Sequence, residues 1–147
     1  AILIGSGNRT NPKNTSVDDQ LFMIRDEKVL TQSFTSSSKP KIVTVDQLMD
    51  IKAKSFENKT VDDFRTLEAE YAKNFVGWRY ALGTAEKALA KPAVIGGVAY
   101  YTSFTPARDT NVMQCDINGG SGALYAFHLH YGAKIYDNLK FNVGKSF

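Results

Sequence analysis

The strongest constraint on the fold is an internal repeat of two strand-forming stretches. In each copy a short apolar run leads into a polar loop, and the loop leads into a second run. This second run has a small or polar residue first, then Leu, then an aromatic residue and then an apolar residue. The first copy comprises residues 1–6 and 19–25, and the second comprises residues 98–103 and 122–128. Short apolar runs bounded by Gly, Asn, Ser and Pro are typical of β-strands joined by turns. The repeat therefore predicts a mainly β protein built from related antiparallel sheets.

The period of the repeat favours a β-propeller, in which each blade is a small antiparallel meander. The second copy has a leading strand at residues 93–95, followed by Gly96-Gly97, a strong signal for a two-residue hairpin. The first copy has no leading strand, because the sequence opens on what would be the second strand of a blade. A propeller closes with about four to eight blades, and this chain supplies roughly two or three. We therefore expect a partial β-propeller with unpaired strand edges.

One block interrupts the β pattern with helical spacing. Thr44-Val45-Asp46-Gln47 fits a capping box, which predicts that Leu48 and Ile51 share one face of a short helix. Thr60, followed by two aspartates at positions 62 and 63, predicts a second helix start. Apolar residues then recur every three or four positions, at Phe64, Leu67, Tyr71 and Phe75. They predict an amphipathic helix that packs on the sheet and stops at Gly77.

These patterns divide the chain into three segments. Residues 1–43 are expected to form a partial propeller blade, residues 44–76 a helical insertion, and residues 77–147 one blade plus strands of a further blade. Because the first blade lacks a strand, we expect residues 134–143 of one copy to complete the blade that begins at Ala1 of the next copy. An isolated monomer is not expected.

Composition excludes several classes of protein. Hydrophobic residues make up 43% of the 147 residues and charged residues 22%, so a buried core can form and the chain is not disordered throughout. A net charge of +3, scattered along the chain, does not indicate nucleic-acid binding. The longest apolar runs, such as residues 92–98, are too short to span a bilayer. The chain opens on Ala1 with no leader pattern, so we expect either a mature product or a fragment.

Few side chains point to catalysis or metal binding. His128 and His130 lie two residues apart on an expected strand and would share one face, but no third metal ligand is visible in the sequence. Cys115 is the only cysteine, which excludes an intrachain disulfide, and no neighbouring His is present to activate its thiol. A free or intermolecular thiol is therefore expected. We predict no catalytic residue, no cofactor site and no metal site, and a protein that is not an enzyme.

Three Asn-x-Ser/Thr sequons lie in polar loops, at Asn8, Asn14 and Asn58. They would carry glycans on a surface protein made in a cell with the glycosylation machinery. Coincidence in loops rich in Asn and Thr is the favoured interpretation, because the motif is short.

Two ordered groups of motifs carry a family resemblance. Near the N-terminus, ILIGSGNR at 2–9 is followed by LFMIRD at 21–26. Further along, GWRYAL at 77–82 is followed by Glu86-Lys87, by KPAVIGGV at 91–98, by YTSFTP at 101–106 and by GGSGALYA at 119–126. In order and spacing, these motifs resemble the C-terminal propeller of type IV pilus assembly proteins and tip adhesins of the PilC/PilY kind. The helical block before Gly77-Trp78 is similar to an insertion in that family.

The resemblance implies a large secreted protein at the tip or base of a retractable pilus, with adhesive and assembly roles. The calcium loop of that family is not carried over, because residues 116–122 lack the later acids and the closing Glu. We therefore expect an extracellular structural and adhesive module on the cell surface or pilus. Its expected partners are other pilus components, other copies of itself joined at strand edges (with a homopolymeric filament as one form) and a host or surface receptor.

A quinoprotein-like propeller enzyme or cofactor-binding domain is the alternative. That group shares the Gly-Gly hairpin and the Leu-Tyr-Ala element at residues 124–126. Such a domain would need acidic, Asn or basic side chains that converge on a cofactor at the propeller axis, and the sequence shows no such cluster. The absorbance spectrum of a bound quinone would reverse this order of preference.

Overall fold

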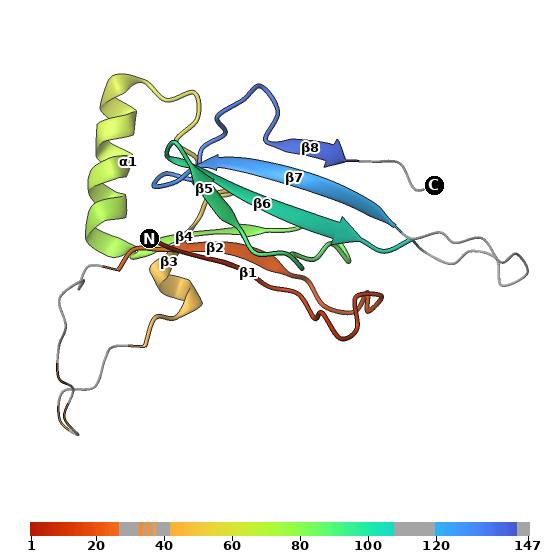
Figure 1. The fold of residues 1–147 in the computed structure, drawn as a ribbon. Helices are drawn as coiled ribbons and strands as arrows, with labels where there is room; N and C mark the ends of the chain where they lie inside the picture. Colours follow the sequence, from red (N-terminus) through yellow and green to blue (C-terminus); the bar gives the residue numbers. More distant parts are fainter. Residues whose placement is uncertain (27–32, 34, 36, 38–41, 108–119, 144–147) are drawn as a thin grey trace, which may run out of the picture.

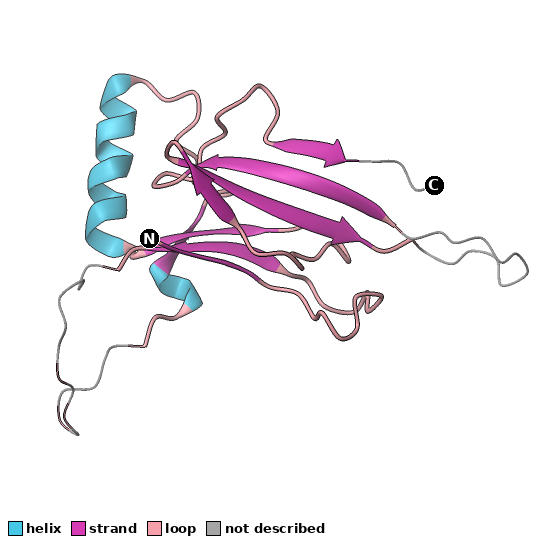
Figure 2. Cartoon of the chain, viewed as in Figure 1, coloured by secondary structure: helices cyan, strands magenta, loops and turns pink. Residues whose placement is uncertain are grey.

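The computed structural model describes residues 1–26, 33, 35, 37, 42–107 and 120–143. The chain is mainly β, as the sequence predicts, with two four-stranded sheets and one α-helix (Figures 1 and 2). The first sheet has the order β1-β2-β4-β3, with β1 at Ile2–Gly5, β2 at Gln20–Ile24, β3 at Leu48–Asp50 and β4 at Gly77–Ala81. The second is a meander of β5 (Ala93–Ile95), β6 (Val98–Thr105), β7 (Ser121–His128) and β8 (Lys140–Val143).

The two sheets pack face to face, with the second above the first in Figure 1. Trp78 of β4 lies between them, with its ring centroid 5.0 Å from that of Phe127 on β7 and 6.1 Å from that of Tyr101 on β6. Its indole Nε1 donates a hydrogen bond to the Leu129 carbonyl at 2.9 Å. Buried aromatic residues satisfy their polar atoms in this way while their rings supply most of the packing. The inner faces of the two sheets therefore form the main core.

The repeat seen in the sequence is also a repeat of strand pairing. Ile4 of β1 pairs with Phe22 of β2, and their counterparts in the second copy, Tyr101 and Tyr125, pair with each other. A slip of one residue would turn every side chain of a strand to the opposite face. The shared register therefore confirms that β1-β2 and β6-β7 are equivalent hairpins, and a further pair of partners agrees: Ile2 with Ile24, and Ala99 with Phe127.

The equivalence extends to a third strand that the sequence comparison did not include. Arg79 of β4 pairs with Phe22, and Lys140 of β8 pairs with Tyr125, the counterpart of Phe22. Trp78-Arg79-Tyr80 thus corresponds to Leu139-Lys140-Phe141, with an apolar, a basic and an aromatic residue in each. The three strands β1-β2-β4 therefore match β6-β7-β8, while among the described residues β5 has no counterpart beside β1.

The predicted hairpin between β5 and β6 is confirmed. Gly96 and Gly97 have φ angles of +56° and +80°, and Ile95 pairs with Val98 on either side of the turn. Both angles lie in the left-handed region, which glycine adopts without the steric cost that a side chain would add.

The helix α1 (Val61–Asn74) begins as predicted, with the Thr60 side chain accepting a hydrogen bond from the Asp63 N–H at 3.2 Å. It stands across one end of the two sheets (Figure 1). Leu67 and Tyr71 are buried, which confirms the predicted apolar face. Ring contacts made by this face reach loop residues as well as the core, with Phe56 5.2 Å from Phe64 and 5.8 Å from Tyr71.

Two expectations within the helical block are wrong. The capping box at Thr44 forms, but it starts a single 3-10 turn (Val45–Gln47), and Leu48 then enters β3 rather than a helix. The strand forms because β3 pairs in parallel with β4, so that Met49 lies opposite Trp78 and is fully buried. Tertiary pairing thus overrides a short local helix signal.

Gly77 does not cap the helix, because α1 ends at Asn74 with Phe75 as its C-cap and Gly77 already belongs to β4. A Cβ at position 77 would lie 1.9 Å from the Met23 carbonyl oxygen of the neighbouring strand. The glycine is therefore required by close approach of two backbones.

The C-terminal strands also differ from expectation. β7 ends at His128, so His130 lies in the following turn, and residues 134–136 form no strand apart from a bridge between Lys134 and Phe127. β8 forms as predicted, but it pairs with β7 of its own sheet. β8 is thus the last strand of the second sheet, and pairing of its other side with β1 of another copy stays a prediction. No helix in the described ranges is long and apolar enough to cross a membrane.

Candidate functional site

The edge strand β1 leaves one side of the first sheet open. β1 pairs with β2 on one side, and within the part of the chain that the structure describes no strand pairs with its other side. In the second sheet the matching position is filled by β5, which pairs with β6. Exposed strand edges recruit further strands, since their N–H and C=O groups need partners. The edge of β1 is therefore a site where an added strand would restore the pattern of the second sheet.

The outer face of the first sheet carries a group of apolar side chains beside the Arg79–Asp50 ion pair. Side chains alternate between the two faces of a strand, so Leu21 and Met23 point into the core while Phe22 and Ile24 point outward. On β1 the outward residues Ile2 and Ile4 are 48% and 44% exposed. The outer face of the second sheet carries another apolar group, in which Tyr136 lies with its ring 5.9 Å from that of Phe141 and hydrogen-bonds the hydroxyl of Tyr100 at 2.8 Å. The two outer faces are thus candidate interaction surfaces.

The buried carboxylate of Glu86 links the connection between the two sheets, residues 82–92, to the second sheet. Glu86 is 2% exposed and accepts hydrogen bonds from Ser103, from the Tyr125 hydroxyl at 2.9 Å, from the Gly83 N–H at 3.0 Å and from the Lys140 ammonium at 2.9 Å. Burial alone would raise the pKa of Glu86, but these four donors outweigh that effect and hold the pKa below its usual value of 4.5. The carboxylate form of Glu86 is therefore favoured, and all four of its donors are groups of the protein itself.

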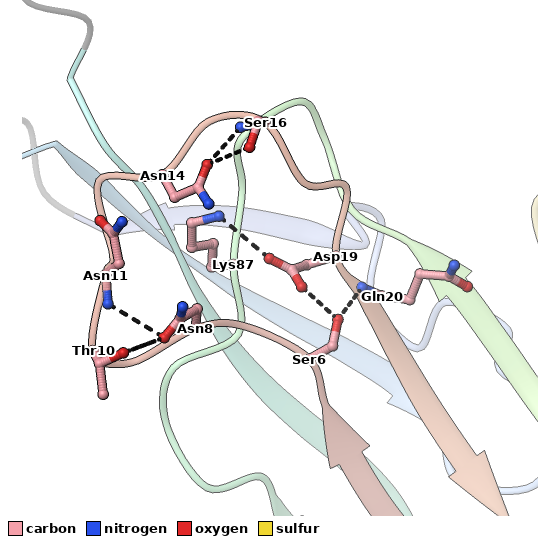
Figure 3. Close-up of polar contacts among 9 residues, drawn as sticks. All are labelled: Ser6, Asn8, Thr10, Asn11, Asn14, Ser16, Asp19, Gln20 and Lys87. Atoms are coloured by element: carbon pink, nitrogen blue, oxygen red, sulfur yellow. Dashed lines mark hydrogen bonds and ion pairs between the residues drawn. The ribbon is translucent and has the colours of Figure 1, made fainter.

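A second buried pair ties the same connection to the first sheet. Lys87, 1% exposed, places Nζ 3.4 Å from Oδ2 of Asp19, and the other Asp19 oxygen accepts a hydrogen bond from Ser6 at 2.8 Å (Figure 3). The Ser6 hydroxyl oxygen in turn accepts from the Gln20 N–H at 2.7 Å. A buried charge pair of this kind is costly to separate but adds little net stability. It specifies how residues 82–92 seat against the ends of β1 and β2.

The histidine pair does not form a metal centre with other described side chains. The His128 and His130 rings lie 6.4 Å apart, and His128 stacks at 5.0 Å on Tyr131. Across the described ranges no group of three His, Cys, Asp or Glu side chains is placed to hold an ion. Burial, followed by the nearby His130, lowers the pKa of His128, which favours the neutral ring. His128 thus lies at the end of β7 and His130 in the following turn, so the two do not share one strand face as expected.

Two of the three sequon asparagines organise the loop between β1 and β2. Oδ1 of Asn8 accepts from the N–H and the hydroxyl of Thr10 at 3.0 and 2.7 Å, and Oδ1 of Asn14 accepts from the N–H and hydroxyl of Ser16 at 2.9 and 2.6 Å (Figure 3). These are Asx turns, in which the side chain imitates a backbone turn. Asn58 has a φ of +53°, a conformation that Asn tolerates better than most residues. Each asparagine therefore has a local structural reason to be present.

Several predictions fall outside the described residues. Cys115 lies in the segment 108–119, as does most of the loop compared with the calcium motif. The Glu86-Lys87 pair was used in the sequence only as part of a family motif, and its burial was missed. The available signal was a Glu-Lys dipeptide flanked by Ala85 and Ala88, which are both buried in the structure. Small apolar neighbours on each side mark a segment that enters the core.

No family model matches the chain, and neither a curated protein nor a solved structure matches it. The internal geometry is therefore the basis for a proposal on function.

Proposed function

We propose that this chain is a structural assembly module, part of a β-propeller, whose first sheet is finished by a strand added from another molecule or from the remainder of a longer chain. The observation that carries the proposal is the three-strand match of β1-β2-β4 to β6-β7-β8, combined with the lack of a counterpart to β5 among the described residues. The added strand would lie beside β1 and pair with its open edge. Main-chain hydrogen bonds supply affinity in strand addition of this type.

The internal packing supports a structural role. Two ion pairs join residues 82–92 to the two sheets: Asp19 with Lys87, which is buried, and Glu86 with Lys140, in which only the carboxylate is buried. Their partners are protein groups, and the charges are used to fix the relative position of two stacked sheets. An enzyme site usually leaves perturbed titratable groups at an open pocket, whereas Glu86 is enclosed by its partners.

The motif resemblance supports a surface setting for this module. We propose that the chain belongs to an extracellular pilus-associated protein of the PilC/PilY kind and contributes adhesive and assembly surfaces. In this proposal the missing strand comes from another pilus component, from the remainder of a longer chain or from another copy.

The setting can be tested on native cells that produce the chain. An antibody raised against the β6-β7 hairpin should label the cell surface or the pili in electron micrographs, and shearing should release the labelled protein. Label confined to the cell interior would overturn the pilus assignment. Hydrogen exchange on the released protein should show the β1 amides protected, and free exchange at β1 in that material would overturn strand completion.

A further inference from the structure

The faces of the two sheets are related in a way that goes beyond the open edge. In the second sheet, Ala99, Tyr101, Tyr125 and Phe127 form the inner face, which packs against the first sheet. Their counterparts by register are the outward residues of the first sheet: Ile2, Ile4, Phe22 and Ile24. The outer face of the first sheet therefore matches, position by position, a face that is buried elsewhere in the same molecule.

The converse holds for the outer face of the second sheet. Tyr100, Leu124 and Phe141 point away from the core, because their strand neighbours Tyr101, Tyr125 and Lys140 point inward. Their counterparts by register on the first sheet are Leu21, which is a core residue, and Leu3 and Tyr80, which are partly buried and pack against the core. Each outer face of the molecule thus corresponds to one half of the interface that already joins the two sheets. On the second sheet, Tyr136 already contacts Phe141 and Tyr100, so it would form part of the docking surface.

From this correspondence we infer that the outer face of the first sheet docks on the outer face of the second sheet in another copy of the chain. The contact would continue the existing sheet-on-sheet interface, with Ile4 taking the role of Tyr101 and Leu124 the role of Leu21. The inference rests on the proposed structural role and names the partner as this chain itself. It concerns faces, whereas the proposed function concerns the edge of β1.

The residues at the two faces suit such a contact. Large apolar side chains are exposed on both faces: Ile2 and Ile4 on the first sheet, at 48% and 44%, and Ile95 and Val143 on the second, at 68% and 60%. The charged Arg79 on the first face is already paired with Asp50 at 3.0 Å, so burying it beneath a partner does not strand a single charge. Contiguous exposed apolar patches on a protein surface often mark interaction sites.

The contact is heterologous, because two different faces meet. Repeated rotation either closes into a ring or continues as a filament. Each copy brings two sheets, and propellers close with about four to eight, so a closed ring would contain about two to four copies. A filament results where the rotation does not close.

Sedimentation of the purified 147-residue chain tests the inference through two variants, one for each face. Ile4→Lys alters the first face and Ile95→Lys the second, and both positions are exposed enough for the monomer to fold. Wild type should sediment as an oligomer, each variant should dissociate at least about tenfold more readily, and Val61→Lys on α1, at a residue that is 67% exposed, should behave like wild type. Ile2→Lys and Val143→Lys provide a second pair, and circular dichroism verifies that each variant is folded.

Mixing the two variants separates this model from a symmetric contact. Ile4→Lys retains an intact second face and Ile95→Lys an intact first face, so the mixture should form a one-to-one heterodimer through the remaining good pair. A monomeric wild type, loss of assembly through only one of the two faces, or absence of heterodimer would each overturn the inference. A monomeric wild type combined with labelled pili would leave strand completion by a different partner intact, so failures of the two proposals are distinguishable.

Discussion

At the scale of single residues, Glu86 is held by four donors. Its carboxylate receives hydrogen bonds from two hydroxyls, a backbone N–H and an ammonium group, and it lies 2% exposed between the connection and the second sheet. Because these donors hold the native pKa below 4.5, the unfolded chain takes up a proton on this group first as the pH falls. The stabilisation by Glu86 is therefore complete above pH 4.5 and is lost as the pH falls through the lower native pKa.

We expect Glu86→Gln to lower the free energy of unfolding at pH 7, because Lys140 loses its charged partner. The difference from wild type should narrow as the pH falls below 4.5 and through the lower native pKa, since wild type loses the contribution of Glu86 there. Urea unfolding at a series of pH values measures both curves. Asp18→Asn, at an exposed carboxylate, is the control and should show no such narrowing. A constant difference for Glu86→Gln at every pH would contradict the assignment.

At the scale of elements, α1 is held by one aromatic face at the end of the sheets. Tyr71 is 2% exposed, its ring lies 5.8 Å from that of Phe56, and the Arg25 guanidinium sits 4.7 Å above it. Its hydroxyl donates to the His130 carbonyl at 2.9 Å, which joins the helix to the turn after β7. Burial raises the pKa of Tyr71 to about 12, so the hydroxyl remains a donor throughout the neutral range.

We expect Tyr71→Ala to cost about 3–5 kcal/mol of unfolding free energy, because it leaves a cavity where a buried ring was. Tyr71→Phe keeps the ring and should cost about 0.5–1.5 kcal/mol, the usual contribution of one hydrogen bond. Lys73→Ala, on the exposed side of the same helix, is the matched control. Equal melting temperatures for Tyr71→Ala and the control would refute the packing of α1 on this cluster.

At the scale of the whole molecule, the two sheets share one core and depend on each other. Trp78 of the first sheet contacts Tyr101 and Phe127 of the second, and its indole reaches the Leu129 carbonyl. The Tyr101 hydroxyl crosses in the opposite direction and donates to the Phe22 carbonyl at 2.8 Å. A single cooperative unfolding transition is the expected behaviour of such a pair.

We expect Trp78→Ala to destabilise both sheets together, by about 3–5 kcal/mol. Hydrogen exchange should accelerate in β6 and β7 by the same factor as in β2, although the substitution lies in β4. Val94→Ala, at a 49% exposed residue on the edge strand β5, should leave both sheets protected. Acceleration restricted to the first sheet would show that the sheets unfold independently.

Local patterns determined much of this architecture. The repeat of apolar runs, the Gly96-Gly97 turn and the face of α1 were all predictable, because each depends on a period or on a turn conformation that neighbouring residues specify. The repeat indicated which strands are equivalent, whereas their pairing register came from the structure.

Only the tertiary structure decided the remainder. Residues 48–50 form a strand because β4 pairs with them in parallel. Position 77 requires glycine because a Cβ there would clash with the backbone of β2. The burial of Glu86 and Lys87 depends on hydroxyl, amine and carboxylate groups that are 17 to 68 residues away in the chain. Such partners are brought together by folding alone, so no local pattern announces them, and the same is true of the two apolar faces that the stacked sheets leave open.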